Sequence, residues 1–180
     1  MTKYLGLQDI INSVEKSLEN ENYIAALALV LTIPDKCGKI EYPGLSSKRR
    51  YTAWYNTWCH CEDPEQIDVL LPDDNGEFIY QLRCAILHNN STDIDYDQVE
   101  DKNKLDEFEL ELTDFNGCFC VCASGVINDG ESRHMRIRII DLCKWICYCS
   151  GIYYEKNKEV VDAANSIKIV DYRDVLNKNK

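Results

Sequence analysis

Hydrophobic residues in the first part of the chain recur at the spacing of helices. Between Leu5 and Leu18 the apolar positions fall on one face and the charged positions on the other, which predicts an amphipathic helix. The segment from Tyr23 to Ile33 is apolar almost throughout and rich in Ala and Leu, so it predicts a buried central helix. This run is too short to span a membrane. Residues 35–40 could carry the helix on beyond Pro34 with a kink.

Turn signals divide the following segment into further helices. Pro43-Gly44 is a firm break, and Ser46 or Ser47 is a candidate cap for the next helix. A short helix is predicted after Asp63-Pro64, where the sequence has an N-cap residue followed by proline. A stronger helix is predicted from Glu77 to His88. The helix after the break carries the aromatic residues Tyr51, Trp54, Tyr55 and Trp58.

After the acidic and irregular segment 93–106 the hydrophobic pattern changes to alternation. Apolar and polar residues alternate from Glu107 to Leu112, which predicts a half-buried strand. The same alternation occurs at Cys118–Ala123 and at His134–Ile139, on either side of the turn signal Asn128-Asp129-Gly130. The three segments predict a small antiparallel sheet, arranged as a hairpin or meander.

The last part of the chain predicts one more helix and a short strand. Asp141 is a candidate cap for a helix from Leu142 to about Lys158, and Ile167–Val170 is a candidate strand. The element order predicts a mainly α protein of the α+β class, a helical bundle with a β insertion before its last long helix. We expect a single domain over residues 1–180, with helices at about 5–92, the β insertion at about 107–140, and the C-terminal helix at about 141–160 followed by a tail.

Composition narrows the class of protein. A chain of 180 residues can bury about 70% of the surface that its unfolded form exposes, so it needs no crosslinks to fold. The formal charge of −11 argues against a protein that coats DNA or sits on anionic lipid through its overall field. The N-terminal residues lack the basic start and apolar run of a signal peptide, so we expect a cytoplasmic protein with reduced thiols and no membrane association.

The 10 cysteines have two competing interpretations. Structural zinc sites usually carry cysteine pairs separated by two to four residues, whereas Cys59-His60-Cys61 and Cys118-x-Cys120-x-Cys122 are spaced by one. On a strand the second group would form a row on one face, which suits packing better than a tetrahedral site. Free cysteine is among the most buried residue types, so we expect core packing, no metal and no cofactor. A zinc-dependent module remains the weaker alternative.

The segment Tyr80–Asn89 carries the candidate chemistry. Arg83 and His88 are separated by four residues near the end of a predicted helix, and at about 100° per residue they lie roughly 140° apart. One helix therefore cannot easily present both side chains to the same phosphate. Two copies of the helix packed antiparallel across a two-fold axis would bring both pairs into one cleft, so the spacing favours a homodimer.

An R-x4-6-H element on a late helix of a small helical bundle resembles the HEPN superfamily of ribonucleases and toxin-like effectors. Residues 23–43, Arg50-Tyr51 with Trp54, and Leu82–His88 also resemble a group of uncharacterised bacterial HEPN-like proteins. The resemblance spans most of residues 10–160. It implies a metal-independent endoribonuclease, acting as a toxin or phage-defence effector with a neutralising or regulatory protein partner.

The same resemblance implies how the residues would act. At a HEPN dimer interface the ribose 2′-OH attacks the adjacent phosphate, with His88 as general acid/base and Arg83 as phosphate clamp. Histidine titrates near neutral pH, and arginine stays charged and matches phosphate geometry. Many family members carry a polar residue such as Asn where this chain has Cys84, and Asn89 partly replaces it; with Tyr80 these are the supporting residues. The alternative is a catalytically inactive HEPN-like dimerisation or interaction module.

Two basic clusters are candidate RNA-binding surfaces in this acidic chain. Lys48-Arg49-Arg50 precedes the aromatic stripe of the third helix, where phosphate contacts and base stacking would be adjacent. Arg136 and Arg138 share one face of a predicted strand with His134. The competing interpretation is a solvated helix start and a strand surface that pairs with acidic residues of the same chain.

Overall fold

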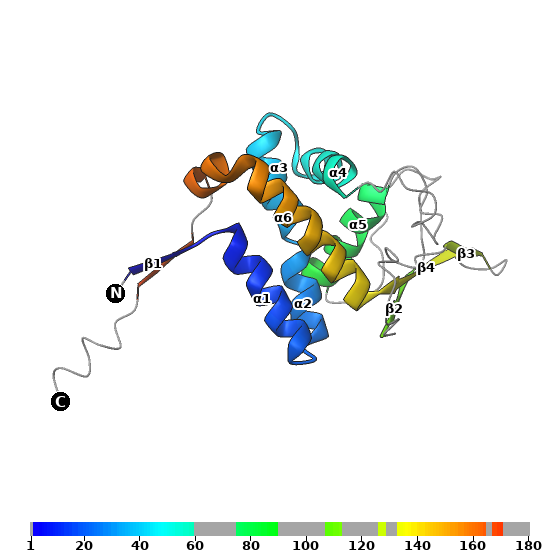
Figure 1. Cartoon of the computed structure of the whole chain (residues 1–180). Helices are drawn as coiled ribbons and strands as arrows, with labels where there is room; N and C mark the ends of the chain where they lie inside the picture. The colour runs from blue at the N-terminus through cyan, green and yellow to red at the C-terminus, as the bar shows by residue number, and fades with distance from the viewer. Residues whose placement is uncertain are drawn as a thin grey trace.

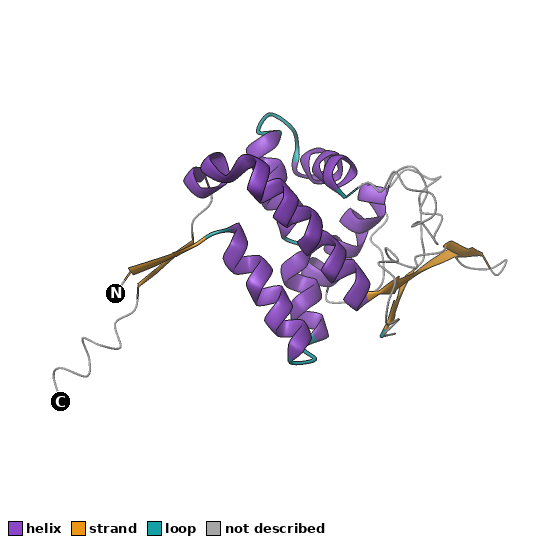
Figure 2. Cartoon of the chain, in the orientation of Figure 1, coloured by secondary structure: helices purple, strands orange, loops and turns teal. Residues whose placement is uncertain are grey.

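The computed structural model of the chain describes residues 2–59, 75–89, 107–112, 126–128, 133–164 and 167–170. The protein is mainly helical, as the hydrophobic pattern predicted, with short strands at both ends of the helical body (Figures 1 and 2). The helices are α1 (Leu7–Glu19), α2 (Tyr23–Val30), α3 (Ile33–Glu41), α4 (Ser47–Trp58), α5 (Asn75–Cys84), the π-helical turn η1 (Ala85–Asn89) and α6 (Ile139–Ala164). The strands are β1 (Thr2–Leu5), β2 (Glu107–Glu111), β3 (Val126–Asn128), β4 (Arg133–Arg138) and β5 (Ile167–Val170).

The first two helices confirm the predictions from hydrophobic spacing. Helix α1 buries Leu7, Ile11 and Val14, which lie on one face at intervals of three and four residues. Its amino end is closed by the Asp9 side chain, which accepts a hydrogen bond from the Gly6 N–H at 2.9 Å. Helix α2 packs against both α1 and α6, as expected for a nearly continuous apolar run.

Helix α3 is a separate helix rather than a kinked continuation of α2. Pro34 lies in its first turn. The N–H groups of a first turn have no partner within the helix, so a proline there costs no hydrogen bond. Farther along, Gly38 lies against α4 so closely that a β-carbon there would stand 2.6 Å from the Arg50 carbonyl oxygen. The α3–α4 pair is therefore in direct backbone contact. Ser46 is the N-cap position of α4, as predicted.

The core is built around α6, which crosses the bundle beside α1 in Figure 1. Its inner face buries Leu142, Ile146 and Tyr153. The Tyr153 ring meets the buried Trp54 ring of α4 edge-on, with centroids 5.5 Å apart. Helix α6 begins at Ile139, two residues before the predicted cap. Asp141 lies in the first turn instead, where its negative charge interacts favourably with the positive end of the helix dipole.

Strands β1 and β5 form a two-stranded antiparallel ribbon that projects from the helical body (Figure 1). The prediction of β5 is confirmed. The sequence pattern did not predict β1, because four residues before an amphipathic helix are too few to show a period of two.

The second sheet confirms an antiparallel hairpin, formed by β3 and β4, but corrects the prediction that the whole sheet is antiparallel. Its strand order is β2-β4-β3, with β3 antiparallel to β4 but β2 parallel to β4, so that Phe108 is opposite Met135. Alternation shows which face of a strand is buried and carries no information about strand direction. The strand predicted at 118–122 and the short helix predicted after Asp63-Pro64 lie outside the described residues.

Candidate functional site around Arg83

Helix α5 holds Arg83 at the edge of the core. Its neighbour Leu82 is fully buried with Phe78 and Ile79, so this face of α5 is fixed against the bundle. At the start of α5 the Gly76 N–H donates to the Asn56 side chain of α4 at 2.8 Å. The contact between α4 and α5 thus sets the position of Arg83, which is half-buried.

The Tyr80 ring and the Cys84 thiol lie next to the Arg83 side chain. Its guanidinium carbon lies 5.8 Å from the centroid of the Tyr80 ring, and its Nη1 lies 4.0 Å from the Cys84 sulfur. The Tyr80 ring in turn meets the Tyr51 ring of α4 edge-on at 5.3 Å. A cation over an aromatic face is stabilised by the ring quadrupole. Tyr80 therefore orients the guanidinium and connects it to α4.

Burial controls the protonation of both tyrosines. Complete burial raises the pKa of Tyr51 well above its usual value, although the nearby Arg83 charge opposes the shift. Burial also raises the pKa of Tyr80, and the interaction with the Cys84 thiol adds to this. Both phenols are consequently protonated at neutral pH. Among the described residues, the buried Tyr51 hydroxyl has no hydrogen-bond partner.

An ion pair between α3 and α4 lies beside these tyrosines. Arg50 donates from Nε and Nη2 to one Asp35 oxygen, both at 3.0 Å, and the Ser47 hydroxyl donates to the same oxygen at 3.2 Å. The Asp35 charge is near enough to add to the raised pKa of Tyr51 and of Tyr80. The site therefore contains the Arg83 guanidinium and, near it, the Asp35 carboxylate, whose negative charge is paired with Arg50.

The backbone between Arg83 and His88 is not a regular α-helix. After Cys84 the chain passes into the π-helical turn η1, whose hydrogen bonds join residues five apart. A wider turn advances each residue by less than about 100°, so position 88 lies less than roughly 140° from position 83. The side chains of His88 and Asn89 lie outside the described part of the structure. Their approach to Arg83 stays a prediction.

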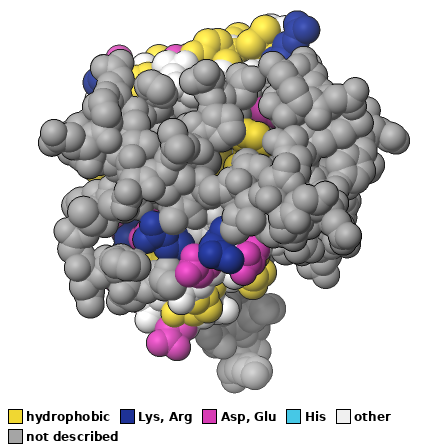
Figure 3. Space-filling model, turned by 90° about the vertical axis from the view of Figure 1, so that its right-hand side faces the viewer, with side chains coloured by type: hydrophobic (Ala, Val, Ile, Leu, Met, Phe, Trp, Pro, Cys, Tyr) yellow, Lys and Arg dark blue, Asp and Glu magenta, His cyan; other side chains and the backbone are white. Residues whose placement is uncertain are grey.

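Four of the five candidate RNA-binding side chains pair with carboxylates of the same chain. Salt bridges join Lys48 to Glu77, Arg50 to Asp35, Arg136 to Glu109 at 3.0 Å, and Arg138 to Asp141 at 3.2 Å. Arg49 is exposed and forms no ion pair within the described residues. On the face shown in Figure 3, the described basic and acidic side chains likewise lie next to each other. RNA binding by these residues stays a prediction, and Arg49 is the side chain most available for it.

The described cysteines belong mainly to the core. The predicted core packing is confirmed for Cys143, Cys147 and Cys149 of α6 and for Cys59, all buried. Burial raises the pKa of Cys147 to about 12 and raises that of Cys37 further, so neither is a thiolate nucleophile near neutral pH. Within the described ranges, no three His, Cys, Asp or Glu side chains are grouped as metal ligands. His60, Cys61 and the predicted cysteine strand lie outside these ranges.

The sequence pattern missed one member of the site. Asp35 was not a candidate, because a single acidic residue after proline is an ordinary feature of a helix start. Tyr51 was noted in the aromatic stripe and in the family resemblance, but nothing in the sequence connects it with Tyr80 or Arg83. Both contacts depend on how α3, α4 and α5 pack together.

Comparisons with known proteins found no match: no protein family, no curated protein and no solved structure resembles this chain closely enough to be assigned. None of the helices in the described residues is both long and apolar enough to cross a membrane.

Proposed function

We propose that the chain is a metal-independent endoribonuclease of the HEPN type, with Arg83 and His88 as its catalytic residues. The observation that carries this proposal is the arrangement at the end of α5. Arg83 is held over the Tyr80 ring, and the π-helical turn that follows reduces the angle between positions 83 and 88. π-Turns within helices occur frequently at functional sites, because they change the direction of the residues that follow them.

In the proposed reaction the substrate supplies its own nucleophile. His88 takes the proton from the ribose 2′-OH, the oxygen attacks the adjacent phosphorus, and the bond to the 5′-oxygen breaks. The leaving oxygen receives a proton, which leaves a 5′-hydroxyl and a 2′,3′-cyclic phosphate. Arg83 stabilises the charge that grows on the non-bridging phosphoryl oxygens. The resemblance to toxin-like effectors extends the proposal to a role in phage defence, with a second copy of the chain completing the cleft and a protein that restrains the activity.

The surroundings of Arg83 support a positioning role for the tyrosines. The Tyr80 ring and the Cys84 sulfur both contact the Arg83 guanidinium, at 5.8 Å from the ring centroid and 4.0 Å from Nη1, so they orient it together. The protonated hydroxyl of Tyr51 is a second donor near the same charge. Cys84 contributes a weaker hydrogen-bonding group than an amide would at that position.

The experiment that tests the proposal is cleavage of a labelled RNA oligonucleotide by the purified chain in the presence of a metal chelator. The proposal predicts products with 2′,3′-cyclic phosphate ends, and no cleavage of a DNA oligonucleotide of the same sequence, because DNA lacks the attacking hydroxyl. Cleavage of both oligonucleotides at the same positions would contradict it.

A second function, that of an inactive HEPN-like interaction module, is favoured by a different observation. Lys48, Arg50, Arg136 and Arg138 are compensated by acidic residues of the same chain, which leaves Arg49 as the one candidate RNA-binding side chain without an ion pair among the described residues. In this case Arg83 is a structural residue. Substituting it would then change the thermal stability or the self-association of the protein, and no RNA cleavage would be detected at any enzyme concentration.

A further inference from the structure

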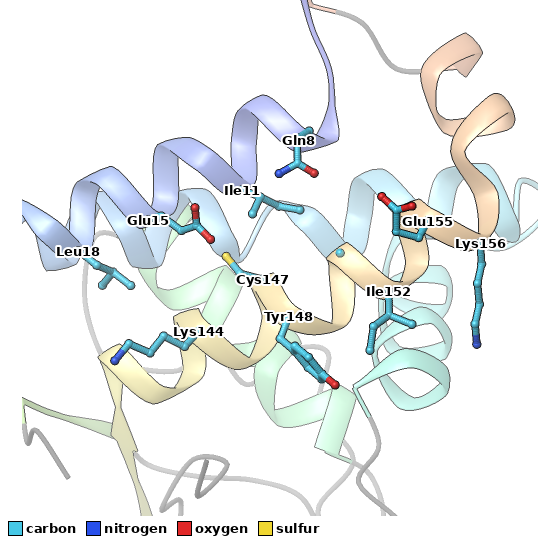
Figure 4. A pocket seen from close by; sticks show the side chains of 11 residues that line it. Gln8, Ile11, Glu15, Leu18, Lys144, Cys147, Tyr148, Ile152, Glu155 and Lys156 are labelled. Carbon is cyan, nitrogen blue, oxygen red and sulfur yellow. The ribbon is translucent and has the colours of Figure 1, made fainter. Parts of the chain in front are cut away.

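An apolar groove runs between α1 and α6, away from the residues that surround Arg83 (Figure 4). Its volume is about 630 Å³. Apolar side chains from both helices form most of its walls, and the Glu15 carboxylate of α1 lies beside Cys147 within it (Figure 4). The lining includes Ile11 and Leu18 of α1, and Cys147, Tyr148 and Ile152 of α6.

The groove exposes large apolar side chains that a helix normally buries. Tyr148 is 56% exposed and Ile152 is 37% exposed. Tyr148 is also held in place, because its ring stacks on Trp145 with centroids 5.8 Å apart, and Trp145 Nε1 donates to the Cys59 carbonyl at 3.1 Å. A rigid, exposed aromatic side chain loses little entropy when another surface covers it, which is typical of interface anchors.

The exposed residues of α6 form one stripe that is complementary to itself. Lys144, Tyr148, Gly151, Ile152 and Glu155 recur at intervals of three and four residues, so they share one helix face. In an antiparallel pair of α6 helices, a two-fold axis at the level midway between Tyr148 and Gly151 places position 144 opposite 155 of the other copy. The same axis places 148 opposite 151 and 147 opposite 152.

Each of these pairs matches in charge or in size. Lys144 faces Glu155 of the second copy twice, once on each side of the axis. Neither side chain forms an ion pair within the described residues. The Tyr148 ring faces Gly151, where a β-carbon would find no atom within 4 Å and the surface is therefore open. Ile152 faces Cys147, which is only 7% exposed in the single chain, so this pair adds a small apolar contact.

We propose that the groove between α1 and α6 is a homodimer interface, in which α6 of a second copy of this chain lies antiparallel against α6 and over α1. A stable interface covers about 800 Å² on each partner, so α1 must contribute as well as the α6 stripe. This interface is separate from the cleft that a second copy would complete at Arg83, because none of the lining residues belongs to the Arg83 site. The proposal therefore does not depend on ribonuclease activity, and a chain that uses both interfaces would assemble beyond a dimer.

The test is sedimentation equilibrium of the full chain at about 1 µM to about 1 mM, which covers weak and moderate self-association. K144E and E155K alone place like charges opposite each other, and each is expected to raise the dimer dissociation constant about tenfold or more. The double variant K144E/E155K exchanges the two charges on both copies and should restore the dimer. K39E, the same charge change at an exposed position of α3, is the matched control and should leave the dissociation constant unchanged.

A second variant tests the apolar part of the interface. Y148E should abolish this interface while retaining the circular dichroism spectrum of the parent, because Tyr148 is 56% exposed in the single chain. Its thermal midpoint should fall only slightly, by the loss of the stacking on Trp145. A parent protein that is monomeric throughout the range overturns the proposal, and so does a dimer that none of these variants weakens. A monomer whose groove binds an apolar dye, with loss of binding in Y148E, would show that the groove takes another occupant and also overturns it.

Discussion

The guanidinium carbon of Arg83 lies 5.8 Å from the centroid of the Tyr80 ring, on the same face of α5 and three residues apart. The same ring packs against the Tyr51 ring of α4, with centroids 5.3 Å apart. The position of the proposed phosphate clamp is therefore determined by the packing of α4 against α5 and not by the arginine alone.

The contact makes Tyr80 a positioning residue with a clear test. Y80L removes the ring and is expected to lower RNA cleavage about 3- to 30-fold, the value of a cation–π contact of intermediate burial. Y80F keeps the ring and is expected to retain most of the rate. Initial rates of cleavage at saturating RNA distinguish the two variants. Equal losses in Y80L and Y80F would mean that the hydroxyl, and not the ring, matters.

Arginine and lysine should differ strongly at position 83. R83K retains the charge but loses the planar donors that hold two phosphoryl oxygens, so we expect cleavage to fall by about 10²- to 10³-fold. The thermal midpoint is measured in parallel, since the side chain is half-buried. A lysine variant that cleaves as fast as the parent would show that position 83 supplies only charge.

The close approach of α3 and α4 predicts the effect of a single methyl group. An alanine in a helix interior usually stabilises relative to glycine, but in G38A the new β-carbon would lie 2.6 Å from the Arg50 carbonyl oxygen, which is backbone and cannot rotate away. We expect a loss of about 1–3 kcal/mol in the free energy of unfolding. G44A, where a β-carbon meets nothing within 4 Å, is the control for urea denaturation and should change little. If the urea midpoint of G38A equals that of the parent, α3 and α4 can move apart without loss of stability, and this prediction is wrong.

Burial of the core thiols predicts how alkylation depends on pH. Since burial raises the pKa of Cys147 to about 12 and that of Cys37 further, both remain protonated at pH 8.5 and should react slowly with iodoacetamide. The raised pKa favours the thiol form, so their reaction accelerates only at more alkaline pH or when the protein unfolds. Cys84, which is partly exposed, should be modified before either of them, as followed by peptide mass mapping. Modification of Cys37 as fast as Cys84 in folded protein would contradict the buried core.

Helix positions were predictable from sequence where one face is apolar. Leu7, Ile11 and Val14 of α1 repeat at helical spacing, and both the helix and its buried face follow from that alone. The same periodicity predicted α6, although the helix ends at Ala164 and the prediction ended at about 160. These elements depend on local periodicity, which a single sequence contains.

Contacts between elements were less predictable. The parallel pairing of β2 with β4 depends on the path of the chain between them and leaves no mark on side-chain alternation. The Asp35–Arg50 pair and the Tyr51–Tyr80 contact arise from helix packing, and the π-helical turn after Cys84 replaces a regular α-helical turn that the pattern predicted. For this reason the Arg83–His88 spacing was identified from sequence, while the angle between the two positions was overestimated.

The most direct test of the central proposal is RNA cleavage by H88A compared with the parent chain. Loss of a general acid/base group predicts a rate lower by about 10²- to 10⁴-fold and loss of the dependence on pH near neutrality. H60A, which removes a histidine outside the proposed catalytic and RNA-binding residues, is the control and should cleave at the parental rate. If H88A is folded and cleaves RNA as fast as the parent, His88 is not a catalytic residue and the proposed function is wrong.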